Sequence, residues 1–253
     1  MQRRAFLCGG GLASMAVAAL LPRALTARAV AAPVRAEALT WLREVAAATQ
    51  GLRGGSLAQA DWQQALADLF ARVPLADLLA SIDFPVLAAA LSLPGDRAGT
   101  IDPTLPDIAG LPRWPECGLR LFGMARGRAI VPHGHANMVS AHLVVQGEMH
   151  VRHYQRERDE DAALVLRPTI DRHSGPGEAT TVSDHHDNVH WLVARSAAAY
   201  TLDFIVLDLD PGRTTRWGDF VDIRAAQRLG DGRLRAPRID FATAIARYGR
   251  DET

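Results

Sequence analysis

The sequence predicts a mainly β fold, in which an antiparallel sandwich or barrel follows an N-terminal helical region. Two patterns along the chain predict it. From about residue 36 to residue 93, apolar side chains recur at the spacing of an α-helix. From Gly118 onwards the period becomes that of strands, in short runs separated by turns such as Gln146-Gly147-Glu148.

The helical region contains one clear amphipathic segment. Ser56 and Gln59 stand three residues apart ahead of it, so we expect a capping box at the start of its helix. A connector rich in Pro and Gly follows over residues 95–117 and favours extended or turn conformations. The apolar stripe of the segment consists of Trp62, Leu66, Leu69, Phe70 and Val73.

Short segments of the remaining chain alternate in the manner of half-buried strands. We expect strands over residues 119–125, 129–132, 138–145, 149–154, 162–166, 180–183, 189–194 and 200–209. The charged residues 156–161 are expected to form a hairpin loop on the surface, and residues 241–250 a terminal helix. Close spacing of this kind indicates antiparallel neighbours.

The first residues indicate export. Arg3 and Arg4 precede a mildly apolar run over residues 9–21, which is the pattern of a twin-arginine signal. Small residues near Ala27 offer a cleavage site, so we expect a signal peptide over residues 1–31. The run is too short to span a membrane stably. The protein is therefore expected to be periplasmic or otherwise exported, with no membrane contact once the signal is removed.

Composition excludes some classes of function. Hydrophobic residues make up 48% of the chain and charged residues 22%, as in ordinary soluble globular proteins. The chain has 28 basic and 28 acidic residues, and the expected signal carries four arginines and no acid. The mature protein is therefore mildly acidic, and no nucleic-acid partner is expected. It keeps one cysteine, Cys117, so no internal disulfide is expected.

The histidines are concentrated in one part of the chain, between His133 and His190. His133 and His135 are two residues apart, and on a strand this spacing places both imidazoles on one face. His190 opens a later alternating segment and is the expected third ligand. Two ligands on one rigid strand lose little conformational entropy on binding an ion, so the pattern predicts a metal site.

Other histidines compete for the same role. His185 and His186 are rivals to His190, but they lie in a polar turn, where histidines are usually solvated. Three more are expected to be sheet residues rather than ligands, and these are His150, the best candidate among them, His142 and His153.

The motifs around these residues resemble the cupin superfamily and, within it, the cysteamine dioxygenase and plant cysteine oxidase family. The first motif of that family, H-x-H-x-x-M followed by G-x-M-H-[IV]-[KR]-x-Y, is similar to residues 133–138 and 147–154. Its second motif, N-M-H, is similar to Asn188-Val189-His190, and its later L-D-V strand and G-R turn are similar to residues 202–204 and 212–213. The resemblance covers about a hundred residues, 119–223.

The resemblance implies a cupin-type double-stranded β-helix, or jelly-roll barrel, over residues 118–225. Residues 32–117 would then form the helical region and connector, and residues 226–253 an extension with a short helix. The resemblance also implies one Fe(II) ion per chain, held by His133, His135 and His190. The reaction it implies is oxidation of a small thiol or an N-terminal cysteine by O2 to a sulfinate.

Departures from related patterns bear on this chemistry. Val139 and Ser140 stand where many cupins have Glu, so we expect no carboxylate ligand. Three neutral imidazoles would leave a divalent ion its full charge and open positions for a thiolate and O2. His186 and Asp187 replace the glycines that usually precede the second motif of the family, which leaves the identity of the substrate open.

Two further residues are catalytic candidates. Asp203 stands in an otherwise apolar segment, where a buried carboxylate needs a partner. It either points to solvent by alternation or orients a ligand histidine or a substrate amine, and the resemblance favours the second role. Tyr154 either donates a hydrogen bond to oxygen or substrate, or packs within its strand.

Two alternative functions stay open at this point. One is a cupin enzyme that acts on a non-thiol substrate, and the other is a non-catalytic periplasmic cupin that binds a metal or a small molecule. A fold by itself does not choose among them, because one fold hosts many functions.

Overall fold

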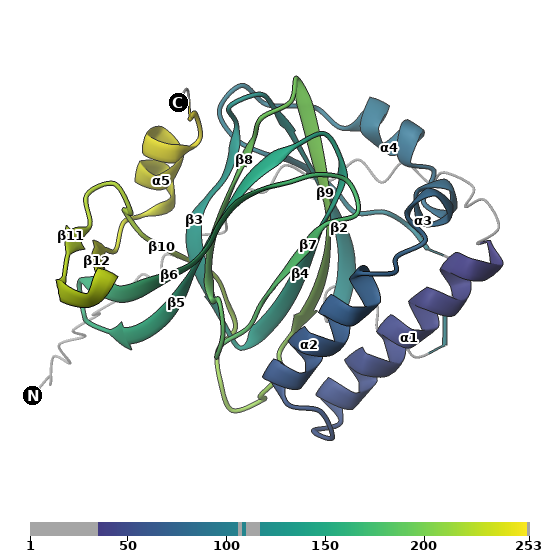
Figure 1. Cartoon of the computed structure of the whole chain (residues 1–253), viewed down its shortest axis with the longest axis horizontal. Coiled ribbons are helices and arrows are strands. Elements are labelled where there is room, and N and C mark those ends of the chain that lie inside the picture. The colour runs from purple at the N-terminus through teal and green to yellow at the C-terminus, as the bar shows by residue number, and fades with distance from the viewer. Residues whose placement is uncertain (1–34, 106–107, 110–116, 252–253) are drawn as a thin grey trace, which may run out of the picture.

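The structure is a computed structural model that describes residues 35–105, 108–109 and 117–251. The predicted signal over residues 1–31 and part of the predicted connector lie outside the described residues. The described residues form two β-sheets that face each other as a barrel, with helices on both outer sides (Figure 1). No helix within these ranges has the length and apolar composition needed to cross a membrane.

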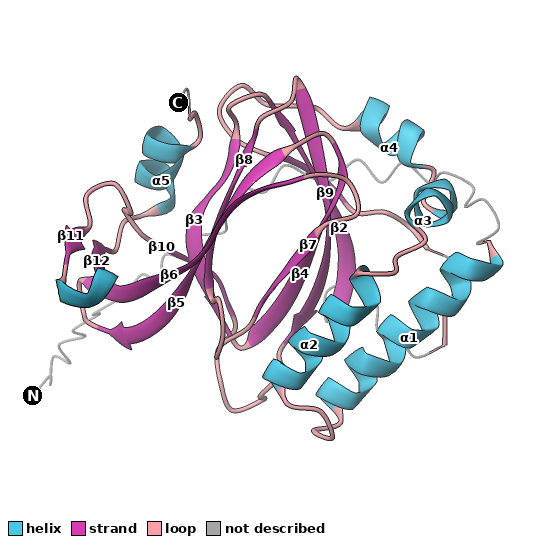
Figure 2. Ribbon diagram, viewed as in Figure 1, coloured by secondary structure: helices cyan, strands magenta, loops and turns pink. Residues whose placement is uncertain are grey.

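Helices precede the barrel, as the helical spacing predicts. Within the described residues they are α1 (Ala36–Arg53), α2 (Gln59–Phe70), α3 (Leu75–Ser81) and α4 (Phe84–Ala90). The predicted stripe on α2 is buried at Trp62, Leu66, Leu69 and Phe70. Because α1 and α2 lie side by side against one sheet (Figure 2), that stripe packs on the barrel rather than on a separate helical core.

The predicted capping box at the start of α2 is wrong. The residue that precedes the helix is Ala58, and it offers no side-chain cap. The hydroxyl of Ser56 donates instead to the carbonyl oxygen of Gly51 at 3.2 Å. The Gln59 side chain is engaged elsewhere, because its Oε1 accepts a hydrogen bond at 2.8 Å from the backbone N–H of Asp184, in the barrel.

The strands pair antiparallel throughout the two sheets of the described chain. The first sheet has the order β1 (Gly99–Ile101), β2 (Cys117–Ala125), β9 (Ala198–Leu207), β4 (Met138–Gln146) and β7 (Ala179–Val182). The second has the order β10 (Arg216–Phe220), β3 (Ala129–Ala136), β8 (Val189–Ala194), β5 (Met149–Asp159), β6 (Ala163–Ser174), β12 (Leu234–Pro237) and β11 (Gln227–Arg228).

The order of β2 to β9 defines the topology. The strands β2-β9-β4-β7 lie together in one sheet and β3-β8-β5-β6 in the other. The chain therefore crosses repeatedly between the sheets and doubles back on itself, which is the arrangement of a jelly roll. The predicted cupin-type jelly-roll barrel with an N-terminal helical region is confirmed by this order.

The structure differs from the predicted strands mainly around β5 and β6. Residues 156–159, expected in a loop, continue β5, and β6 extends to Ser174. Ion pairs from Arg156 to Asp159 and, at 3.0 Å, to Asp219 of β10 hold this charged stretch in the sheet. Strands β1, β10, β11 and β12 lack a clear alternating pattern in the sequence, and they are short.

Both outer faces of the barrel are covered. Trp41 of α1 and Phe70 of α2 pack on Phe204 of β9, with the three ring centroids 5.5 to 5.6 Å apart. On the other side, Tyr248 of α5 (Phe241–Tyr248) meets Trp191 of β8 with ring centroids 5.1 Å apart. Because both faces of the central strands are buried, these strands have near-continuous apolar sequences, and their inward polar residues are conspicuous.

Candidate metal centre

Three histidines converge inside the barrel on two paired strands. His133 and His135 come from β3 and His190 from its neighbour β8. The ring centroid of His133 lies 4.6 Å from that of His135 and 4.5 Å from that of His190, and the remaining pair is 5.1 Å apart. One nitrogen of each ring lies within 4.8 Å of the others. The structure thus brings together the residues that the sequence predicts as ligands.

A β-bulge at Pro132 turns both histidines of β3 into the barrel. Ile130 packs among interior residues, so strict alternation would point His133 outwards. The pairing of β3 with β8 shifts between Ile130 and His133, which lies opposite His190. Pro132 has no N–H to donate, and prolines within sheets are confined to edges and bulges. The bulge therefore places His133 and His135 on the interior face.

Asn188 and Gly134 fix the distance between β3 and the segment that leads into β8. The Asn188 amide donates to the carbonyl oxygen of His135 at 3.1 Å and accepts from the backbone N–H of the same residue at 3.3 Å. A Cβ at position 134 would lie 2.6 Å from the Asn188 side-chain oxygen. The glycine between the two histidines therefore allows Asn188 to approach and to hold the ligand strands together.

Helix α2 holds the loop that precedes His190. Gln63 donates to the carbonyl oxygen of His186 at 3.4 Å, and Gln59 contacts the backbone of Asp184. The carboxylate of Asp184 in turn accepts from the backbone N–H of Asn137 at 2.9 Å. The helical region thus positions the loop over residues 183–188, a role that its amphipathic pattern did not indicate.

Burial keeps the three imidazoles neutral. The Nδ1 of His133 donates to the carbonyl oxygen of Val131 at 2.8 Å, which leaves Nε2 as the ligand atom of that ring. Desolvation lowers the pKa of His133, and it lowers the pKa of His135 and His190 well below the usual range, with repulsion from neighbouring imidazoles adding to the effect. Neutral imidazole is the form that binds metals, so these residues fit a divalent cation.

No carboxylate belongs to the ligand cluster. Among the described residues, His133, His135 and His190 are the one group of His, Cys, Asp and Glu side chains close enough to hold an ion together. Val139 and Ser140, at which the sequence predicts no carboxylate ligand, lie on β4 in the opposite sheet. The predicted three-histidine ligand set without an acid is therefore consistent with the geometry.

Two more imidazoles, which sequence reasoning assigned to sheet packing, enter the same interior. The ring centroids of His142 on β4 and His153 on β5 lie 5.0 and 5.9 Å from that of His190. Burial lowers the pKa of each to about 3. Neither nitrogen of His153 has a hydrogen-bond partner among the described residues. The sequence did contain a signal for His142. Ser140 and His142 are two residues apart, so they share one face of a strand that is otherwise apolar.

Asp203 does not point to solvent. It is buried on β9 directly opposite His142, and its Oδ2 lies 3.7 Å from the Nε2 of His142. Desolvation raises the pKa of its carboxyl well above the usual range, against the opposing effect of the Arg120 guanidinium. Of the two roles considered for Asp203, the interior one fits the geometry, with His142 as its neighbour instead of one of the three clustered histidines.

The structure does not bring Tyr154 to the metal centre, which corrects the prediction of a catalytic role. His153 and Tyr154 are consecutive on β5 and lie opposite His190 and Val189, respectively. Tyr154 therefore shares the outer face of the sheet with Val189, and it packs in an apolar cluster there. Burial in that cluster raises the pKa of Tyr154 to about 12. Its alternative role, strand packing, is the one observed.

The remaining rival histidines lie at the surface. His185 and His186 are exposed in the loop before β8, as expected of turn residues. His150 stacks on His173 with ring centroids 4.9 Å apart and forms an ion pair with Asp171 on the outer side of β5 and β6. Of His142, His150 and His153, the sequence favours His150 as an alternative ligand. The structure instead places His142 and His153 closer to the centre.

Comparisons with known proteins add the following. A scan against models of protein families gave no match, and a search of curated proteins gave none either. Among solved structures, the chain is similar to a cupin superfamily protein from Desulfitobacterium hafniense, at 15% identity over 48% of this chain and 88% of that one, with a TM-score of 0.32.

Two other solved structures show a similar degree of likeness. KdgF from Halomonas sp. is 20% identical over 43% of this chain and 77% of that one, with a TM-score of 0.31. A recombinant oxalate oxidase in complex with glycolate is 17% identical over 47% of this chain and 55% of that one, with a TM-score of 0.34. At these values the fold assignment rests on the strand order itself, and the site is argued from its own residues.

Proposed function

We propose that this protein is an Fe(II)-dependent thiol dioxygenase that oxidises a small thiol or an N-terminal cysteine to a sulfinate with O2. The observation that carries the proposal is a cluster of three neutral imidazoles without a carboxylate, formed by the partly buried His133 and the buried His135 and His190. The motifs around them, which are similar to those of the cysteamine dioxygenase and plant cysteine oxidase family, support the same activity.

Imidazole suits iron, and neutral ligands leave a divalent ion its full positive charge. Bound Fe(II) would supply the redox chemistry and would favour the thiolate form of a thiol substrate. In the overall reaction, a thiolate sulfur takes up both atoms of one O2 molecule. The sulfur is oxidised as O2 is reduced, so the reaction needs no further reductant.

The interior residues of this chain would bind and orient the substrate. His142 and His153 each present a neutral imidazole with one donor and one acceptor nitrogen. Asp203 provides a carboxyl group that an ammonium group would ionise, since a neighbouring positive charge favours the carboxylate. Both cysteamine-like thiols and N-terminal cysteines carry such an ammonium group, so this combination supports an aminothiol as substrate.

The environment of the cluster would also exclude water. Below the histidines the interior is filled by apolar side chains such as Val151 and Leu192, both essentially inaccessible to solvent. Towards the loop over residues 183–188 the residues are polar, and His186 lies 3.1 Å from the carboxylate of Asp187. A substrate would therefore enter from the polar side and place its reacting group near the imidazoles.

We also propose that the protein acts after export, on the basis of Arg3, Arg4 and the apolar run that follows them. The twin-arginine route carries folded proteins, so an ion bound before export would travel with the chain. Soluble thiol and O2 are the proposed partners, and nucleic acid is not among them.

The proposal is tested by O2 uptake on protein loaded anaerobically with Fe(II). We expect uptake with cysteamine or with a peptide that begins with cysteine, and a product that carries both atoms of isotopically labelled O2. The same protein loaded with redox-inactive Zn(II) is the control and should consume no O2. Absence of uptake across a broad panel of thiols would overturn the proposal and leave the non-thiol enzyme or the binding protein as the function.

A further inference from the structure

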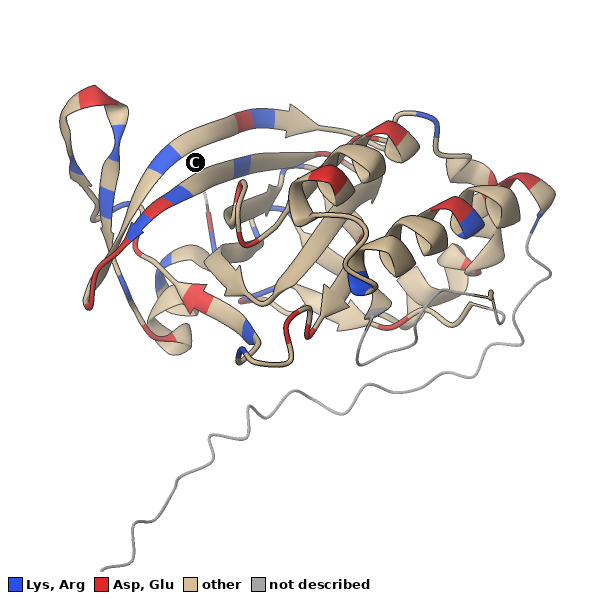
Figure 3. Ribbon diagram, turned by 90° about the horizontal axis from the view of Figure 1, so that it is seen from below, with Lys and Arg blue, Asp and Glu red and all other residues tan. Residues whose placement is uncertain are grey.

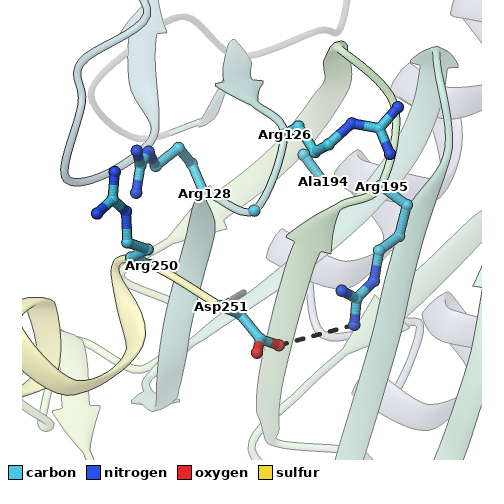
Figure 4. Close-up of a pocket in the computed structure, with 7 residues that line it drawn as sticks. Arg126, Arg128, Ala194, Arg195, Arg250 and Asp251 are labelled. Carbon is cyan, nitrogen blue, oxygen red and sulfur yellow. Dashed lines mark ion pairs between the residues drawn. The ribbon is translucent and has the colours of Figure 1, made fainter. Parts of the chain in front are cut away.

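Four aspartates are buried within the described residues, and two of them are matched by arginines. Asp222 forms an ion pair with Arg247. Asp251 lies 3.2 Å from Arg224 and 3.7 Å from Arg195, and Figure 4 marks the second of these ion pairs. A buried carboxylate needs such a partner, because removing a charge from water costs free energy. The other two are Asp203, already placed beside the metal centre, and Asp187.

Asp187 has no arginine ion pair within the part of the chain that the structure describes. Asp184 stands in the same loop, and its carboxylate lies 2.8 Å from Arg213. Asp187 instead meets the exposed His186, whose Nδ1 lies 3.1 Å from its Oδ2. The Oδ1 of Asp187 is buried without a hydrogen-bond partner among the described residues. The loop itself therefore satisfies only one oxygen of this carboxylate.

The backbone at position 187 is of a kind that favours glycine. Its φ is 53°, in the left-handed region that glycine adopts readily and most other residues avoid. The motifs that this chain resembles have glycines at this point, where His186 and Asp187 stand here. The chain therefore carries a carboxylate at a position where neither the backbone nor the burial favours one, and such outliers point to a functional role.

Asp187 lies close to the metal centre, on the side from which a substrate would enter. It is three residues from His190, so the two Cα atoms are at most about 11 Å apart. Its backbone N–H donates at 3.1 Å to the Oε1 of Gln155, which is two residues from His153 on β5. A small molecule bound at the clustered histidines would therefore have Asp187 within its reach.

The attraction that Asp187 exerts on a cation is a property of this position. The chain as a whole carries equal numbers of basic and acidic residues, 28 of each. Figure 3 shows the two signs interspersed over the described strands and helices. General negative charge on the molecule would therefore not account for a cation held at Asp187.

We propose that Asp187 binds a second positive charge of the thiol substrate, so that the preferred substrate is a diaminothiol. This inference rests on the proposed thiol dioxygenase function. Asp203 would pair with the ammonium group next to the thiol, and Asp187 with an ammonium group several bonds further out. Hydrogen bonds between two charged groups are about twice as strong as neutral ones, so the second contact should have a measurable effect on affinity.

The test first measures binding, without O2, to the whole protein loaded with redox-inactive Zn(II). The two probes are N-(3-aminopropyl)cysteamine and N-butylcysteamine, which have the same length and differ in the terminal ammonium group. In titration calorimetry the diaminothiol should bind about tenfold more tightly, or by about 1.4 kcal/mol. Equal affinities for the two probes would overturn the proposal.

The variants Asp187→Asn and Asp187→Gly connect the preference to this carboxylate. Each removes the negative charge, and glycine also suits the left-handed backbone, so both should bind the two probes almost equally. The matched control is Asp161→Asn, which removes an exposed acid between β5 and β6 and should keep the preference. A preference that both Asp187 variants keep, or that the control loses as they do, would contradict the assignment.

O2 uptake by the Fe(II)-loaded protein distinguishes this inference from the proposed function. The preference should recur as a ratio of about ten between the kcat/KM values of the two probes, mainly through KM. No uptake with any thiol, at an unchanged binding preference, would remove the dioxygenase function and keep Asp187 as the cation site. Uptake with cysteamine, at equal kcat/KM for the two probes, would keep the function and overturn the role of Asp187.

Discussion

The two halves of the barrel interior are built on the same strands but differ in chemistry. Strand β8 carries His190 in one half and Leu192 in the other, and β5 likewise carries His153 and then Val151. The half with the histidines also contains Asp203, and its imidazoles are neutral because they are buried. The other half is wholly apolar in its packed cluster.

The comparison shows a division of roles. The apolar half stabilises the fold, and the polar half holds the side chains of the candidate site. Burial of apolar surface is the main favourable contribution to folding, and it holds the strands rigid. The polar half makes the opposite contribution, since desolvated imidazoles and a buried carboxyl cost free energy unless they are paired. Side chains of a reactive site need to be held by a rigid surrounding, and here the same strands supply both. Substitutions in the polar half should therefore act mainly on activity, and substitutions in the apolar half mainly on stability.

The largest effect is expected from His190→Ala, in the polar half. Loss of one of three ligands should reduce thiol-dependent O2 uptake by more than about 100-fold, which is the upper range for residues that only support a ligand. The matched control is His185→Ala, which removes an exposed histidine of the preceding loop and should retain activity. O2 electrode rates on equal amounts of folded protein decide, and equal losses in the two variants would contradict the assignment.

In the apolar half, Leu192→Ala should affect stability instead of chemistry. Leu192 is 0% exposed, so its truncation leaves a cavity and should lower the free energy of unfolding by about 3 kcal/mol. Urea unfolding measures this loss. Metal content and rate per folded molecule should stay near those of the unaltered protein, and a loss of metal would mean that the two halves are not separable.

The buried histidines make the metal-free protein sensitive to acid. The pKa of His142 and His153 falls from 6.5 to about 3 in the folded state, so below pH 6.5 the unfolded chain binds protons that the native one does not. Stability therefore falls as the pH falls, by roughly 2 kcal/mol for the pair between pH 6.5 and about 5.5. Asp203 acts with the opposite sign, because its raised pKa gives the native state the extra proton.

Urea unfolding at both pH values, on the unaltered protein and on His142→Gln/His153→Gln, isolates the contribution of the two histidines, since Asp203 is common to both. The variant should show the flatter pH dependence. An equally steep decline in the two proteins would place the acid sensitivity in other groups.

Asp203→Asn should raise stability and lower activity. Removal of a buried ionisable group should raise the free energy of unfolding by about 1 kcal/mol. The same change should lower kcat/KM for an aminothiol about tenfold, within the range for residues that orient a site, through loss of the negative charge that pairs with the ammonium group. A thiol without an amine should lose much less, and an equal loss for both substrates would argue for a purely structural role.

The smallest effect is expected from Tyr154→Phe. Because Tyr154 faces away from His190, O2 uptake should change by less than about twofold. This is a small effect, since even a tenfold change in rate corresponds to only about 1.4 kcal/mol. A large loss of rate at unchanged stability would restore the catalytic role that the sequence suggested for this residue.

The barrel and the three clustered histidines could be predicted because they depend on local patterns. The alternation of strands such as residues 189–194 and the spacing of His133 and His135 survive in the sequence. Which residues of β3 face the interior could not be predicted, because this depends on the bulge at Pro132, where the predicted strand ends. A bulge is decided by pairing with β8, which is distant in sequence.

The remaining site residues depend on which face of a strand is buried. The sequence predicts His142 as a sheet residue and not a ligand, and His142 does lie on β4 outside the ligand cluster, but its ring faces the interior beside His190. Tyr154, a catalytic candidate, packs in an apolar cluster on the outer face instead. Helices cover the outer face of β4, so both of its faces are buried and polarity does not mark inside and outside along it. On β5, His153 and Tyr154 are consecutive and both buried, so burial does not tell which of them faces the interior. The contact between α2 and the loop before β8 is likewise tertiary, so no pattern within the helix indicated it.

The central claim, that the imidazoles of β3 and β8 hold one metal ion, is tested most directly by metal content after anaerobic loading and gel filtration. The unaltered protein should retain about one Fe(II) per chain, and His133→Ala/His135→Ala should retain almost none. The surface pair His150→Ala/His173→Ala is the matched control and should retain the ion. Retention of iron by the first variant, or its loss only from the second, would contradict the account.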